Sequence, residues 1–141
     1  MKRNIPITEI MTTELVTVQL HDPLSKVVEK LRHHHIRHLP VLLNNQLAGI
    51  ISRTDINRLC FSGLFPEEEE VDEGVLEMLS LSQVMTHKPR VVKGNQTLED
   101  VAKILAKEEF HALPVVDPQN EALLVGIVTT TDVIRYMLEE F

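Results

Sequence analysis

An internal repeat constrains this chain more than any other feature. Met11 and Thr12 recur as Met85 and Thr86, and the triplet LPV at 39–41 recurs at 113–115 at the same displacement. The segment GIISRTD at 49–55 recurs as GIVTTTD at 126–132 after a slightly longer loop. Because a repeat fixes architecture more firmly than local propensity, we expect two copies of one small supersecondary unit.

Each copy begins with the pattern of a short strand followed by a helix. The strand is predicted around Val16, and Asp22 with Pro23 predicts an N-cap followed by a proline in the first helical position. Apolar residues then recur at the spacing of one helical face, at Leu24, Val27, Val28 and Leu31. In the second copy, Thr97 and the acidic residues that follow it can cap the equivalent helix.

A hairpin and a closing helix complete each copy. The apolar runs 39–43 and 47–51 flank Asn44 and Asn45, which tolerate the positive φ of a tight hairpin turn. The closing helices are predicted at about 54–60 and 131–139. The predicted fold class is therefore α/β (α+β), with β-α-β-β-α repeats in tandem.

One unit of this size buries only a small core, so we expect the two copies to pack together. We predict repeat 1 at 1–60, an acidic linker with a short helix at 61–80, and repeat 2 at 81–141. Seven acidic and no basic residues lie within 61–80, which accounts for most of the formal charge of -7. We expect the short helix, around 75–81, to pack beside the second copy.

Composition excludes several classes of function. With no basic tract, four Phe, one Tyr and no Trp, the chain lacks the charge and the stacking surface typical of nucleic-acid binders. It contains no apolar run that would span a membrane and no signal-peptide pattern near its start, so we expect a cytoplasmic protein without membrane contact. Cys60 is the only cysteine, which excludes an intrachain disulfide and an intrachain cysteine zinc site.

Taken twice and in this order, the Met-Thr pair, the helix, the Leu-Pro-Val strand and the Gly-Ile-x-Ser/Thr-x-x-Asp ending resemble a CBS domain pair, or Bateman module. The resemblance implies two β-α-β-β-α repeats related by a pseudo-twofold axis. It also implies a cleft between the repeats that binds AMP, ADP, ATP or S-adenosylmethionine, with no tightly bound cofactor. Such pairs often form homodimers and regulate another protein, here unidentified. This chain departs from the many members that are fused to an effector, since little of it lies outside the repeats.

Two aspartates are the leading ligand-binding candidates. Asp55 and Asp132 could each accept hydrogen bonds from two vicinal ribose hydroxyls. Ser52 and Thr129, three residues earlier, place a hydroxyl at the start of a helix, where it would bind ribose or the α-phosphate. The same Ser/Thr-x-x-Asp pattern is also a helix-capping box that needs no ligand, and both roles can coexist.

The resemblance also implies cations for the phosphates, supplied by the opposite repeat. For the Asp55 site the candidate is His111. For the Asp132 site the candidates are Arg37 and His38, which offer one permanent and one titratable charge. On that basis we expect the Asp132 site to suit di- and triphosphates better. Backbone groups near Val16 and Arg90 would read the adenine.

These residues favour a regulatory, nucleotide-sensing, signal-transducing module. We predict no enzyme, because no nucleophile with a base, metal set or catalytic carboxylate pair has convincing spacing. The alternative is a homodimeric interaction scaffold in which the aspartates act only as caps. A third hypothesis is a metal or catalytic role for the histidines at 33–35 and His38. Consecutive helical side chains do not converge, so we predict no metal and expect 33–35 to end the first helix.

Overall fold

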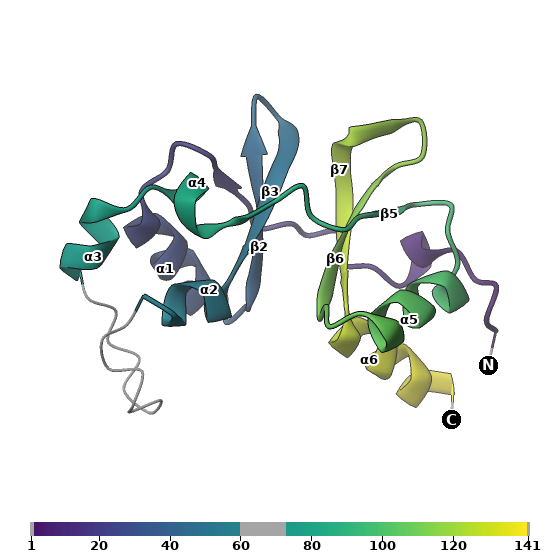
Figure 1. Cartoon of the computed structure of the whole chain (residues 1–141). Helices are drawn as coiled ribbons and strands as arrows, with labels where there is room; N and C mark the ends of the chain where they lie inside the picture. Colours follow the sequence, from purple (N-terminus) through teal and green to yellow (C-terminus); the bar gives the residue numbers. More distant parts are fainter. Residues whose placement is uncertain (1, 60–72, 141) are drawn as a thin grey trace. The chain divides into compact units, whose positions relative to one another are not determined.

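The computed structural model describes residues 2–59 and 73–140, and these form two compact units that differ in chain continuity (Figure 1). One unit, called here the continuous unit, is Val16–Lys88. The other, called the split unit, combines Met1–Leu15 with Pro89–Phe141. Cys60 and the acidic run at 67–70 lie outside the described residues.

The continuous unit is built on a four-stranded sheet in the order β1-β2-β3-β4. Strand β1 runs parallel to β2, and the other neighbours are antiparallel. The β2–β3 hairpin turns at Asn44 and Asn45 with φ of 51° and 63°, which confirms the predicted positive-φ turn. Its elements are β1 (Val18–Gln19), α1 (Leu24–His33), β2 (His38–Leu43), β3 (Gln46–Ser52), α2 (Arg53–Asn57), α3 (Glu73–Met78), α4 (Leu81–Val84) and β4 (Thr86–His87).

The split unit repeats this plan around a three-stranded sheet in the order β5-β6-β7. Strand β5 is parallel to β6, and β6 and β7 form an antiparallel hairpin. Its elements are η1 (Ile7–Glu9), β5 (Val92–Lys93), α5 (Leu98–Lys107), β6 (Ala112–Asp117), β7 (Asn120–Thr129) and α6 (Thr130–Glu140). The order β-α-β-β-α therefore occurs in both units, and the predicted fold class is confirmed.

The first helices of the two copies begin differently. In α5, the Thr97 hydroxyl accepts from the Asp100 N–H and the Asp100 carboxylate accepts from the Thr97 N–H, so the predicted cap is confirmed. The predicted Asp22 cap is wrong: α1 has Pro23 at its N-cap position, without a side-chain cap. The Asp22 carboxylate instead accepts from the Gln19 N–H at 2.8 Å, which closes the turn after β1.

The short segment that precedes each copy completes the unit formed by the other copy. Thr12 exchanges two backbone hydrogen bonds with Ile127 of β7, at 2.8 and 3.0 Å. In the same way β4, which contains Thr86, pairs with β3 at Gly49 and Ile50. The backbones of β3 and β4 approach closely, since a Cβ at Gly49 would lie 2.6 Å from the Thr86 carbonyl oxygen. Glycine is required there by proximity.

Each unit has its own apolar core, and helices α3 and α4 contribute to the core of the continuous unit. Leu76, Leu81 and Met85 are buried in one core cluster with side chains of α1, β2 and β3. Helix α3 also packs against α1. The expectation that the linker helix packs beside the second copy is therefore wrong. The position of Leu81 in the split unit is taken by Ile7, which is completely buried there.

Candidate functional site

The Ser52–Asp55 turn joins β3 to α2 in the continuous unit. The Ser52 hydroxyl accepts from the Asp55 N–H at 3.1 Å, and Asp55 Oδ2 accepts from the Ser52 N–H at 2.8 Å. This reciprocal pair is a capping box, and it holds the carboxylate in one orientation. The second oxygen, Oδ1, lies 3.8 Å from a guanidinium nitrogen of Arg58, and the side chain is 17% exposed.

The Thr129–Asp132 turn joins β7 to α6 in the split unit with the same local geometry. Asp132 Oδ2 accepts from the Thr129 N–H at 2.9 Å, and the Thr129 hydroxyl accepts from the Asp132 N–H at 3.1 Å. Oδ1 lies 3.9 Å from a guanidinium nitrogen of Arg135, much as in the other turn. At 8% exposure, Asp132 is the buried charged residue of the described chain.

One contact distinguishes the two carboxylates. The Thr12 hydroxyl lies 3.2 Å from Asp132 Oδ1 and 3.4 Å from Oδ2, so it donates to a carboxylate that the cap already holds. Thr86 occupies the equivalent place beside β3, but within residues 2–59 and 73–140 no hydrogen bond joins it to Asp55. Sequence reasoning missed Thr12. The signal was present, because the Met-Thr pair recurs in both copies.

The predicted cations are divided between the units. In the continuous unit, the Arg37 carbonyl accepts from the Arg53 N–H at 2.8 Å, and His38 pairs with Ser52 across the hairpin. In the split unit, the His111 carbonyl accepts from the N–H of Thr130, the residue after Thr129, at 3.0 Å. Each of these residues is therefore joined through its backbone to the motif of its own unit. The predicted pairings of His111 with Asp55, and of Arg37 and His38 with Asp132, join different units and stay predictions.

The two positions proposed to read adenine lie just before the first strand of each unit. Val16 is half-buried and packs against the core that surrounds β1. Arg90 is exposed, and its Nε lies 4.0 Å from Glu108 Oε2, an oxygen that is buried and has no hydrogen-bond partner. Val16 therefore shares a unit with Asp55, and Arg90 shares one with Asp132. Their contact with a base remains a prediction.

The histidines end the first helix as predicted. Helix α1 stops at His33, His34 is its C-cap, and His35 has a positive φ of 53°, typical of a residue that leaves a helix. The rings of His33 and His34 pack edge to face with centroids 4.8 Å apart. Across the described ranges, no three His, Cys, Asp or Glu side chains are grouped so that they could hold a metal ion.

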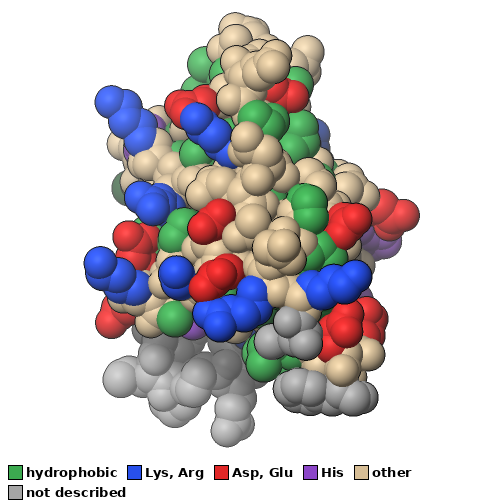
Figure 2. Space-filling model, turned by 90° about the vertical axis from the view of Figure 1, so that its right-hand side faces the viewer, with side chains coloured by type: hydrophobic (Ala, Val, Ile, Leu, Met, Phe, Trp, Pro, Cys, Tyr) green, Lys and Arg blue, Asp and Glu red, His purple; other side chains and the backbone are tan. Residues whose placement is uncertain are grey.

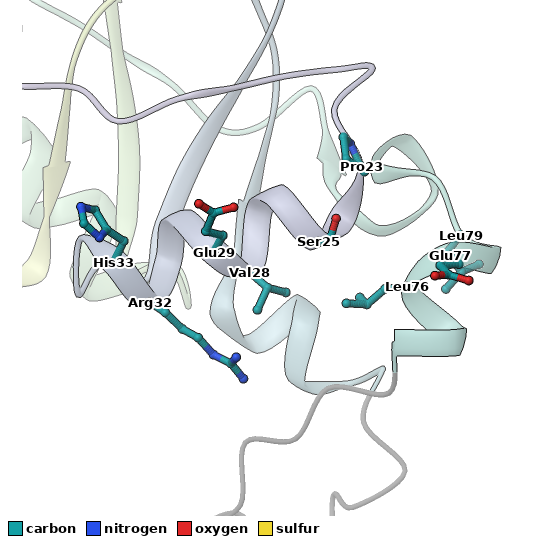
Figure 3. A pocket seen from close by; sticks show the side chains of 9 residues that line it. All are labelled: Pro23, Ser25, Val28, Glu29, Arg32, His33, Leu76, Glu77 and Leu79. Atoms are coloured by element: carbon teal, nitrogen blue, oxygen red, sulfur yellow. The ribbon is translucent and has the colours of Figure 1, made fainter.

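A groove of about 980 Å³ lies elsewhere in the continuous unit, between α1 and α3 (Figure 3). Its apolar part comes from Val28 of α1 and Leu76 of α3, whose side chains point toward each other. Its rim has both signs of charge, from Glu29, Arg32 and Glu77. None of the predicted ligand-binding residues lines this groove, so the two aspartate motifs remain the candidate site.

Charged side chains of both signs are mixed on the face drawn in Figure 2. Lys and Arg side chains alternate there with Asp and Glu, and no continuous basic area is visible on that face. Among the described helices, none is long and apolar enough to cross a lipid bilayer.

Comparison with known proteins places these features in a family. The model of the CBS domain matches residues 7–62 and 81–139. The protein MJ0188 of Methanocaldococcus jannaschii is 30% identical over 137 residues, which are 97% of this chain and 46% of that protein. Inosine-5'-monophosphate dehydrogenase of Korarchaeum cryptofilum is 30% identical over 120 residues, 85% of this chain and 22% of the enzyme. The chain thus spans less than half the length of either relative.

The solved structures give the same result for the fold. The crystal structure of CBSX2 in complex with AMP matches with a TM-score of 0.78 and 27% identity, covering 96% of this chain and 98% of that one. The two family matches fall on the two β-α-β-β-α copies described above. The chain therefore belongs to the CBS domain family, of which it contains two copies.

Proposed function

We propose that this chain is a regulatory, ligand-sensing CBS pair that binds an adenosine nucleotide, with AMP as the first candidate, through Asp55 and Asp132. The proposal is carried by one observation: in both turns the cap fixes one carboxylate oxygen, Oδ2, and leaves Oδ1 outside the cap. Capping and ligand binding can therefore use different oxygens of the same carboxylate. The two roles that the sequence left open are compatible.

The chemistry of a ribose suits such a carboxylate. Its two adjacent hydroxyls are donors, and an ionised carboxylate accepts several hydrogen bonds at once. Because the capping box holds the carboxylate in place before binding, little side-chain freedom is lost when the ligand arrives. The hydroxyls of Ser52 and Thr129 accept from backbone N–H groups, so each still has its own proton to donate to a ribose or phosphate oxygen.

Similarity to CBSX2 supports AMP as the ligand, because that protein has been solved with AMP and shares 27% identity over nearly all of both chains. We further propose that His111, Arg37 and His38 neutralise phosphates, and that backbone groups near Val16 and Arg90 contact the adenine. A non-catalytic role in the cytoplasm, as a homodimer that regulates another protein, completes the proposal.

The test is a titration of the purified chain with AMP, ADP, ATP, S-adenosylmethionine and NADH, followed by thermal unfolding and calorimetry. A ligand at 100 times its dissociation constant stabilises the folded state by about 2.7 kcal/mol if it binds only that state. We expect AMP to raise the unfolding temperature, Asp55→Ala and Asp132→Ala each to reduce the calorimetric stoichiometry, and the double variant to abolish the shift.

Asp100→Ala is the matched control, because Asp100 belongs to a third capping box with nearly the same distances, 3.0 and 3.2 Å, and no proposed ligand role. It loses a cap just as the other two variants do, so it should keep the whole AMP response. If millimolar nucleotide produces no shift in the wild type, the sensing proposal is wrong and the scaffold hypothesis is favoured. Equal loss of AMP binding in all three variants would show that the aspartates act only as caps.

A further inference from the structure

The Asp132 carboxylate has a protein donor that the Asp55 carboxylate lacks. The Thr12 hydroxyl is within 3.2 and 3.4 Å of its two oxygens, and Thr12 is held there by two backbone hydrogen bonds to Ile127. All of these atoms lie within the split unit. The arginine three residues after each aspartate is placed alike in both units, at 3.8 and 3.9 Å, so it does not explain a difference between them.

A hydroxyl that donates to a carboxylate competes with any ligand that donates to the same oxygens. Binding ribose at Asp132 exchanges the Thr12 hydrogen bond for a ligand hydrogen bond, or crowds both donors onto one oxygen. Binding ribose at Asp55 adds hydrogen bonds to Oδ1, which lies 3.8 Å from a guanidinium nitrogen of Arg58. The net gain from a hydrogen bond depends on what it replaces, so the gain should be smaller at Asp132.

We infer that Thr12 is a specificity-determining residue of the Asp132 motif, whose hydroxyl occupies the carboxylate and makes this motif the weaker of the two for ribose. The inference rests on the proposed function, and it assigns the N-terminal segment a role in ligand affinity at a site formed near the other end of the chain. The two sites of one chain therefore fill at different nucleotide concentrations, Asp55 first.

The experiment isolates one motif at a time and measures AMP binding by calorimetry. In an Asp55→Ala background, Thr12→Val removes the hydroxyl while keeping the shape of the side chain, and Thr12→Ser restores the hydroxyl. We expect Thr12→Val to tighten AMP binding severalfold and by no more than about tenfold, or about 1.4 kcal/mol, because the Thr12 hydroxyl lies 3.2 and 3.4 Å from the two carboxylate oxygens, farther than in a strong hydrogen bond to a charged group. Thr12→Ser should leave the affinity as it was.

Thr86→Val in an Asp132→Ala background is the matched control, since Thr86 pairs with β3 as Thr12 pairs with β7. It should not change AMP affinity. Ligand-free unfolding provides a second measurement: Thr12→Val should lower the unfolding temperature more than Thr86→Val, because only Thr12 donates to a buried carboxylate. Thr12→Ala serves in the same role if the valine variant does not fold.

The outcomes separate the inference from the function beneath it. If Asp132→Ala still binds AMP but Thr12→Val does not tighten binding at Asp132, the inference is wrong and the proposed function stands. The inference is also overturned if Thr12→Val weakens binding, because the hydroxyl then assists the ligand. If neither the wild type nor any variant binds AMP, the proposed function fails and the inference fails with it.

Discussion

The Ser52–Asp55 and Thr129–Asp132 turns have nearly the same backbone and different carboxylate environments. Both are reciprocal capping boxes with hydrogen bonds between 2.8 and 3.1 Å. Only Asp132 accepts a further hydrogen bond, from Thr12, and it is also the more buried of the two, at 8% against 17% exposure. A repeated motif thus specifies the local geometry, and a residue far away in the sequence changes what that geometry offers to a ligand.

The largest effect is expected in the buried residues that precede each copy. Leu81→Ala should destabilise the continuous unit and Ile7→Ala the split unit, each by about 2–5 kcal/mol, because each removes a buried side chain from a different core. Hydrogen exchange measured by mass spectrometry should show lost protection within Val16–Lys88 for Leu81→Ala. Loss of protection mainly at 89–140 for that variant would contradict the assignment of α4 to the continuous unit.

A smaller effect on stability is expected from alanine at Gly49 and at Gly126, where the backbone of the segment that precedes the other copy lies close to the glycine. A Cβ at Gly49 meets the Thr86 carbonyl oxygen at 2.6 Å, whereas the nearest backbone atom at Gly126, the Thr12 carbonyl oxygen, is 3.0 Å away. The Met11 side chain also lies close to Gly126, but a flexible side chain moves more easily than backbone. Gly49→Ala should therefore lower the free energy of unfolding by about 1–3 kcal/mol, and Gly126→Ala should lower it by less. Urea denaturation measures both. Equal losses of stability in the two variants would contradict the predicted difference between the two backbone contacts.

The smallest effect concerns the Thr97–Asp100 capping box, which serves as a baseline for the boxes at Asp55 and Asp132. The Thr97 backbone N–H and then its hydroxyl lower the pKa of Asp100 from its ordinary value of 3.8. The folded state therefore binds this proton more weakly than the unfolded state, and the stabilisation is present above pH 3.8 and lost as pH falls through the lowered value. Asp100→Asn should be less stable than wild type at neutral pH, and thermal unfolding should show this deficit disappearing in acid.

Much of the local structure could be predicted from short stretches of sequence. Asn44 and Asn45 form the expected turn, Thr97 and Asp100 form the expected cap, and α1 ends at the predicted histidines. These features depend on neighbours within a few residues, where spacing and side-chain chemistry decide the outcome. Asp22 shows where that reasoning ends, because its carboxylate accepts from the Gln19 N–H before the helix and does not cap α1.

What could not be predicted is which copy each segment completes. In the structure Met85 lies beside Gly49, and Met11 lies beside Gly126. Self-comparison matches Met11 with Met85 and Gly49 with Gly126, but it does not say which methionine contacts which glycine. The contact between Thr12 and Asp132 joins residues 120 positions apart, and no local pattern encodes it. The same ambiguity explains why the expectation for the linker helix was wrong, since its apolar residues suit the core of either copy.

The exchange of leading segments also determines the order in which the units become complete. The continuous unit has all of its parts once Lys88 has been synthesised, whereas the split unit waits for β7 and α6 while its first piece, Met1–Leu15, is already present. Closing the split unit requires a loop that contains the whole of Val16–Lys88, and a folded insert shortens that loop. During vectorial synthesis the continuous unit would therefore fold first. As a folded insert, it would then ease the joining of the two pieces of the split unit.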